Sequence, residues 1–299
     1  MGGESGHTDA IACLWEGGVQ VVNIPVDLAL QTQRHERISM NYDKGQIEEI
    51  ELEKVQVLAA MEDLWLALAR DIAPSLGISR ANEYLLHGVC RRLKLIRRCV
   101  ENTFYIFPVD RKAVLTEEEK SDLEINLHAF VININGLQDN LAWVYLFEKG
   151  LNAKVKNGAL GVGLFKEQTQ AHLPADLRDY LSKETIMNWH KQYAKDYRDA
   201  LAHRIPLYIP PFQMADTDMQ KYQDIEGEIR IKIETKEFDK ACDLYEKQEA
   251  IRRPSLFYAH STRDLDSFSP MLLHPQVIVD SKTVIEITEM VMRHVQKIL

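Results

Sequence analysis

The chain has 299 residues, of which 45% are hydrophobic and 27% charged, and its formal net charge is −9. This composition is that of a folded globular protein and excludes a disordered chain. The negative charge disfavours non-specific binding of nucleic acid by the whole surface, although a local basic patch could still bind it.

Two absences indicate where the protein works. No stretch approaches 18 consecutive apolar residues, and the amino-terminal segment lacks the basic and apolar regions of a secretory signal. The four cysteines are scattered without a C-x-x-C pair, which disfavours both a disulfide framework and a thiolate zinc site. We therefore expect a soluble cytoplasmic protein with no membrane segment.

The first half of the chain predicts an irregular segment and then helices. Residues 1–44 show no helical period. Apolar residues recur every three or four positions over 46–73 and again over 85–107, and Pro74 and Pro108 close these two helices.

The third helix has the clearest start. Thr116 and Glu119 have the T-x-x-E spacing of a capping box, and Gly150 stands at the far end of the apolar run. The glycine-rich residues 152–170 predict a loop. A fourth helix is expected over 174–203, with a break near Ser182.

The last third of the chain has a weaker pattern. Charges spaced for i,i+4 pairs predict one long helix over 226–252, followed by short strands or loop over 254–279. A final helix is expected from Ser281. The fold class is therefore mainly α, a helical bundle over 45–211 with a smaller α/β extension over 212–299.

Most familiar catalytic motifs are missing. The chain has no P-loop, H-E-x-x-H, G-x-S-x-G or kinase signature. No His, Cys, Asp or Glu cluster has metal-ligand spacing, so we expect neither a metal nor a cofactor.

One motif stands out, the segment from Arg198 through Asp199 to His203 at the end of the fourth predicted helix. It resembles the motif of HEPN domains, in which an arginine and a polar residue precede a histidine by four to six intervening residues. The resemblance extends to the plan of several helices over about 46–211. It implies a helical-bundle fold, metal-independent endoribonuclease activity in active members, a homodimer, and a toxin or defence setting with an antitoxin or regulatory partner.

The residue chemistry of this motif is suited to RNA cleavage. A histidine in the last turn of a helix lies at the negative end of the helix dipole, and Asp199 is four residues before it on the same face. His203 would act as general acid or base, Asp199 would orient it, and Arg198 would stabilise charge on the phosphate. The plainer alternative is a capping histidine with a surface ion pair.

The spacing of the motif creates a geometric difficulty. Five residues of a regular helix turn through about 500°, which leaves Arg198 and His203 about 140° apart around the axis. Either the last turn is distorted by Pro206, or a second copy supplies the complementary group across a two-fold axis.

Two further groups of polar residues are candidates for RNA contacts. Arg91, Lys94 and Arg98 form one stripe of a predicted helix and, with Arg204, are the expected phosphate-binding residues, although a solvated face paired with acids is the alternative. The third helix carries polar residues that are poor helix formers. They are expected to line a cleft beside the motif or to hydrogen-bond within the bundle: His128, Asn135, Asp139 and Asn140.

The sequence therefore predicts a metal-independent endoribonuclease that binds RNA as a homodimer. The alternatives are a non-catalytic HEPN-like module that binds RNA, a nucleotide or a protein, and a structural protein in which the motif only ends a helix.

Overall fold

The computed structural model describes residues 41–261 and 268–296. Most of the segment predicted to be irregular, residues 1–40, lies outside this part of the chain. The described residues are mainly helical, as predicted, with one small two-stranded sheet.

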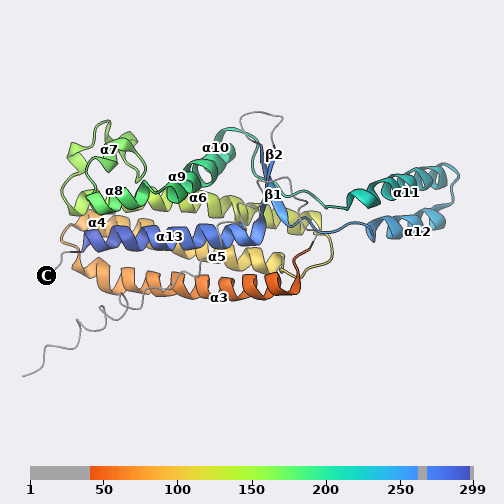
Figure 1. The fold of residues 1–299 in the computed structure, drawn as a ribbon, viewed down its shortest axis with the longest axis horizontal. Helices are drawn as coiled ribbons and strands as arrows, with labels where there is room; N and C mark the ends of the chain where they lie inside the picture. Colours follow the sequence, from red (N-terminus) through yellow and green to blue (C-terminus); the bar gives the residue numbers. More distant parts are fainter. Residues whose placement is uncertain (1–40, 262–267, 297–299) are drawn as a thin grey trace, which may run out of the picture. The chain divides into compact units, whose positions relative to one another are not determined.

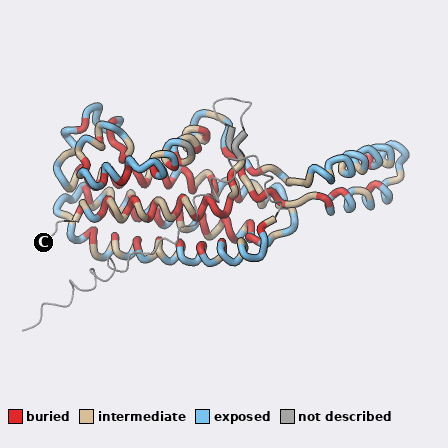
Figure 2. Tube along the Cα trace, viewed as in Figure 1, coloured by how far each residue is buried: buried red, intermediate tan, exposed pale blue. Residues whose placement is uncertain are grey.

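Four long helices form the bundle, as Figure 1 shows. They are α3 (Lys44–Ala67), α5 (Arg91–Ile106), α6 (Glu117–Glu148) and α13 (Leu273–Val295). Helix α5 packs between α3 and α6, and α13 packs against α3 and α6. Figure 2 shows buried positions recurring along each of these helices, which is the pattern of helices that share one core.

The predicted start of α6 is confirmed. The Thr116 hydroxyl accepts a hydrogen bond from the Glu119 backbone at 3.1 Å, and the Glu119 carboxylate accepts one from the Thr116 backbone at 2.9 Å. This capping box satisfies two backbone donors at the helix start. The helix ends before Gly150, which has a φ of 64° that suits glycine.

Irregular helical turns adjoin the regular part of each of the first two predicted helices. Helix α3 is followed by the π-helical η2 (Leu68–Ile72) and the short η3 (Ala73–Ser75). Helix α5 is preceded by α4 (Ser79–Glu83) and by η4 (Tyr84–Cys90), a π-helical segment in which the backbone is wound more widely than in an α-helix.

The segment from residue 152 to 203 is more helical than predicted. Its expected loop contains short helical turns: η5 (Asn152–Lys154), η6 (Gly158–Gly161) and α7 (Glu167–Gln170). The fourth predicted helix is divided, and the expected break at Ser182 is present. Its parts are α8 (Ala175–Leu181), α9 (Glu184–Asn188), the π-helical η7 (Trp189–Ala194) and α10 (Lys195–His203).

The predicted long helix over 226–252 is wrong in its bounds. Two helices, α11 (Asp216–Glu234) and α12 (Phe238–Glu249), lie side by side and pack on each other. Lys236 between them has a φ of 60°, which breaks the helical path.

The expected start of the last helix is also wrong. Strands β1 (Phe257–Ser261) and β2 (Phe268–Leu272) form an antiparallel pair, and α13 follows β2 at once from Leu273. Helix α13, the last element of the predicted extension over 212–299, packs against α3 and α6 of the bundle. Among the described residues, no helix has the length and apolarity needed to cross a membrane.

Candidate functional site

Helix α10 is anchored by its apolar and aromatic face. Tyr197 and Ala200 are buried, and the Tyr197 ring meets the buried Tyr258 ring of β1 edge-on, with centroids 5.7 Å apart. The opposite face of the helix carries the polar residues of the motif. The contacts of Tyr197 and Ala200 thus anchor the helix by one face. Arg198 and Asp199 lie away from that face and are each half-buried.

Side chains of α6 fix the backbone before and after α10. The Asn135 amide donates to the Ala194 carbonyl at 2.8 Å, just ahead of the helix. The His128 Nε2–H donates to the Leu207 carbonyl at 2.7 Å, and the Glu124 carboxylate accepts from the Ile209 amide at 2.8 Å. His128 and Asn135 therefore position the motif from within the bundle, which is one of the two roles the sequence left open.

His203 is the last residue of α10 and is exposed. Within the described chain its side chain has no hydrogen bond or ion pair. The imidazole is consequently available to an outside group at the end of the helix.

The two acids of α10 pair with arginines. Asp199 lies 3.2 Å from the Nε of Arg198 and is not seen paired with His203, the partner that the sequence predicted for it. Asp196 lies 3.6 Å from Arg204, whose other terminal nitrogen is buried without a partner. The Arg198 side chain is 43% exposed, so its ion pair is in contact with water and is weak.

The helix is regular through its last turn, and only Arg204 after it is extended. The distortion that would bring Arg198 and His203 to one side of α10 is therefore not present. Of the two solutions that the sequence offered, the distorted last turn is thus wrong, and the second copy of the chain stays a prediction.

Asp139 on α6 is an electrostatic neighbour of the motif. Asp139 is exposed as a residue, yet partial desolvation by neighbouring protein atoms raises the pKa of its carboxyl, while the charges of Lys166, Arg198 and Arg92 act in the opposite direction. Asp139 thus interacts with cations from three separate parts of the chain, among them the arginine of the motif.

The three residues of the predicted basic stripe of α5 have different neighbours. The Lys94 ammonium lies 3.7 Å from the centroid of the Trp65 ring, and Arg98 pairs with Glu101 at 3.1 Å. Arg91 alone of the three lines a pocket, together with Asn140 of α6. Arg98 is thus paired with an acid, as the alternative of a solvated face expects, whereas Lys94 lies on an aromatic ring.

The same pocket contains functional candidates that the sequence did not reveal. Arg92 and Asn133 line it beside Arg91 and Asn140. By the helical period, Arg92 lies off the stripe of Arg91, Lys94 and Arg98. In the structure its side chain points from α5 toward α6. A helix-interior glycine, Gly136, was the available signal, since glycine in a helix often marks the close approach of another group.

One histidine near the motif is not suited to proton transfer at neutral pH. His190 is stacked on Phe165 with ring centroids 3.8 Å apart and contacts the Gln138 carbonyl oxygen at 3.2 Å. Burial lowers its pKa to about 4, with a further contribution from nearby Lys195, Lys191 and Arg198. His190 is therefore neutral at pH 7.

The described residues contain no group of three or more His, Cys, Asp or Glu side chains placed to hold a metal ion. The chemistry available at the motif is instead that of an imidazole and a guanidinium, which transfer protons and neutralise negative charge. Comparison of the chain with models of protein families, with curated proteins and with solved structures gives no match.

Proposed function

We propose that the chain is a metal-independent endoribonuclease of HEPN type that works as a homodimer. The observation that carries this proposal is the state of His203, which is exposed at the end of a firmly anchored helix and has no partner among the described residues. An exposed imidazole without a partner is open to an RNA strand, which a general acid or base must reach.

The reaction needs two proton transfers and one charge to be neutralised. A base removes the proton of a 2′-hydroxyl, the oxygen attacks the adjacent phosphate, and the 5′-oxygen leaves with a proton. His203 takes or gives one of these protons, and Arg198 stabilises the extra negative charge on the phosphate. Because the two residues lie on different sides of α10, the Arg198 and His203 of one site come from two copies of the chain.

A pair of substitutions tests this assignment. His203→Ala should abolish cleavage of a single-stranded RNA while leaving its binding nearly intact, because it removes a proton-transfer group and no anchor. Arg198→Ala should lower the turnover rate by about 100- to 1000-fold, with a much smaller effect on binding. Cleavage is followed by gel electrophoresis and binding by fluorescence anisotropy.

Matched controls come from the same chain. His172→Ala and Arg98→Ala remove the same residue types away from the motif and should cut as the wild type does. All four variants are first compared by circular dichroism and thermal melting. If the folded His203→Ala and Arg198→Ala proteins cleave RNA at the wild-type rate, the nuclease assignment is wrong.

A second candidate function is a non-catalytic module that binds RNA, a nucleotide or a protein partner. The observation that favours it is that Asp199 pairs with Arg198, so that no described carboxylate orients His203. RNA retention by the wild type without any cleavage would identify this function. Neither retention nor cleavage would leave α10 as a structural helix end.

A further inference from the structure

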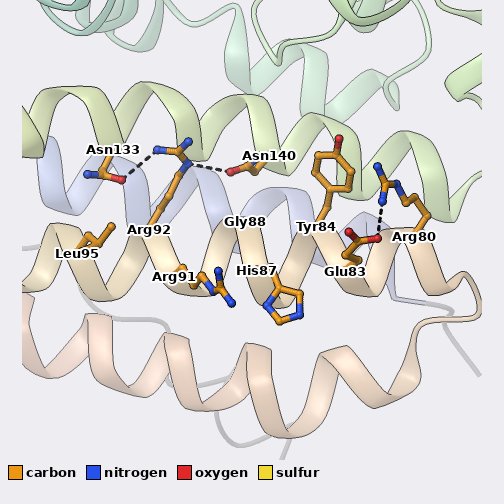
Figure 3. A pocket seen from close by; sticks show the side chains of 10 residues that line it. All are labelled: Arg80, Glu83, Tyr84, His87, Gly88, Arg91, Arg92, Leu95, Asn133 and Asn140. Atoms are coloured by element: carbon orange, nitrogen blue, oxygen red, sulfur yellow. Dashed lines mark hydrogen bonds and ion pairs between the residues drawn. The ribbon is translucent and has the colours of Figure 1, made fainter.

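A pocket of about 420 Å³ lies between η4 and α5 on one side and α6 on the other. Figure 3 shows Arg92 reaching from α5 to α6, whereas His87 and Arg91 lie at the edge of the same helical stretch that is turned away from α6. The volume is within the range of about 300–1000 Å³ that small-molecule sites occupy.

Arg92 is held in place by neutral groups. Its Nε donates to the Asn140 carbonyl oxygen at 2.9 Å and its Nη1 to the Asn133 carbonyl oxygen at 3.0 Å (Figure 3). The guanidinium lies so close to Gly136 that a Cβ atom there would clash with it. Arg92 is half-buried and makes no ion pair in the described part of the chain.

This arrangement leaves the guanidinium without an ion-pair partner among the described residues, and the charge of Asp139, which acts on it electrostatically, is shared with Lys166 and Arg198. Removing part of the water from a guanidinium is unfavourable unless an anion compensates for it. Asn133 and Asn140 use two of its five donors, and the remaining ones are on the terminal nitrogens, where a tetrahedral anion is bound best.

The neighbouring Arg91 adds to the same positive charge. Arg91 and His87 line the pocket and have neither a hydrogen bond nor an ion pair with any described residue. Arg80 is paired with Glu83 at 2.5 Å, which is the one acid of the lining, and lies over the Tyr84 ring at 5.2 Å. The lining is thus cationic although the whole chain carries a net charge of −9.

The other arginines of α5 show that this absence of partners is particular to the pocket. Arg97 pairs with Glu101 at 2.9 Å and with Glu62 at 3.6 Å, and Arg98 pairs with Glu101. Arginines on the same helix are therefore neutralised everywhere except where the pocket opens.

We propose that this pocket binds a nucleoside phosphate, with Arg91 and Arg92 holding the phosphate and the Tyr84 side of the pocket receiving the base. Arginine suits phosphate because its planar fork makes paired, charge-assisted hydrogen bonds. Tyr84 lies in an aromatic group with Trp143 and Phe147, at ring distances of 5.6 and 5.4 Å, which gives its ring a fixed orientation. The ligand is either a free nucleotide or one nucleotide of an RNA strand, and the site does not depend on cleavage at His203.

The test measures binding of defined probes to the full-length chain. AMP and adenosine are titrated by isothermal calorimetry, and two RNA oligonucleotides of one sequence, with a 5′-phosphate or a 5′-hydroxyl, by fluorescence anisotropy. Arg91→Ala is the test variant, because Arg91 is exposed and its loss should not disturb the fold. Arg98→Ala is the control, since it removes the same charge from the same helix outside the pocket.

AMP should bind and adenosine should not, and Arg91→Ala should weaken AMP binding about tenfold or more while Arg98→Ala leaves it unchanged. Preference for the 5′-phosphorylated RNA would identify a strand end as the source of the phosphate, and AMP binding without any preference between the RNAs would identify a free nucleotide. The proposal is overturned if AMP does not bind at millimolar concentration, if adenosine binds equally well, or if the two arginine variants behave alike.

Discussion

Asp280 shows how strongly the bundle interior changes one side chain. This carboxyl of α13 is buried, and it accepts hydrogen bonds from the Trp189 indole at 2.8 Å and the Gln276 amide at 2.6 Å. The phenols of Tyr193, Tyr197 and Tyr258 interact with this carboxyl electrostatically. Burial therefore raises the pKa of Asp280 to about 7.

The raised pKa predicts a pH dependence of stability. The folded protein keeps the proton of Asp280 in a range where the unfolded chain has lost it, so this group makes folding less favourable as pH rises from about 4 to about 7. The slope is at most about 1.4 kcal/mol per pH unit. Asp280→Asn keeps the acceptor for Trp189 and removes the titration, so the variant should lose this slope in urea unfolding.

The comparison has to be made between wild type and variant, because two histidines titrate in the opposite sense. Burial lowers the pKa of His190 and of His274 to about 4, so both destabilise the fold as pH falls below their ordinary value. They contribute equally to both proteins and cancel in the difference. Parallel curves for wild type and Asp280→Asn between pH 4 and 7 would contradict the assignment.

At the scale of elements, α6 organises both candidate sites. One face uses Asn135, His128 and Glu124 to fix the backbone around α10, and another uses Asn133 and Asn140 to hold Arg92. Polar residues that weaken a helix in isolation are thus used for contacts with its neighbours. This explains why so long a helix tolerates them, and why Asp139 interacts electrostatically with both Arg92 and Arg198.

Gly136→Ala tests the contact between α6 and Arg92. Alanine is favoured over glycine in a helix by up to about 1 kcal/mol, but here its Cβ would displace the guanidinium and break two charge-assisted hydrogen bonds. We expect a net loss of about 1–3 kcal/mol in unfolding free energy and weaker AMP binding.

Gly227→Ala is the matched control for this experiment. Gly227 lies inside α11 with nothing within 4 Å of the position of a Cβ atom, so alanine there should stabilise the protein by roughly 0.5–1 kcal/mol. Stabilisation of the same size by both substitutions would show that Arg92 does not depend on Gly136.

At the scale of the whole molecule, the motif predicts a dimer with sites shared between two copies. Light scattering at micromolar concentration should give twice the mass of the chain. Neither Arg198→Ala nor His203→Ala should cut RNA efficiently alone, yet a mixture of the two should recover activity. A mixed dimer has one site with both residues intact, so random exchange restores about a quarter of the wild-type rate.

This recovery separates a shared site from a site within one chain. If Arg198 and His203 served the same site in one copy, each mixed dimer would contain only damaged sites, and mixing would restore nothing. A protein that is monomeric at micromolar concentration and still cleaves RNA would equally exclude the shared site.

The proposed chemistry also predicts independence from metal ions. Proton transfer by His203 and charge neutralisation by Arg198 need no cation, so cleavage should be unchanged in EDTA. The measurement is a cleavage time course before and after chelation. Abolition by EDTA with rescue by Mg²⁺ or Mn²⁺ would show that another set of residues carries the reaction.

Local sequence signals determined those elements whose residues bond or pack close to one another in the chain. Three such signals act within a few residues and can therefore be recognised in the sequence alone. They are the capping box of Thr116 and Glu119, the period of the first helices and the break at Ser182. The mainly helical class follows from the same signals, and so does the place of Arg198 and His203 on a late helix.

The tertiary structure decided everything that depends on a distant neighbour. Helix α13 begins at Leu273, inside the range 254–279 for which the sequence predicted short strands or loop. Pro275 is tolerated there because a proline in the first turn replaces an amide that has no partner, and packing against α3 and α6 outweighs local propensity. Asp199 pairs with Arg198, and Arg92 rather than Lys94 reaches α6. Such outcomes depend on which helices meet and how closely, and neither residue spacing nor composition encodes that information locally.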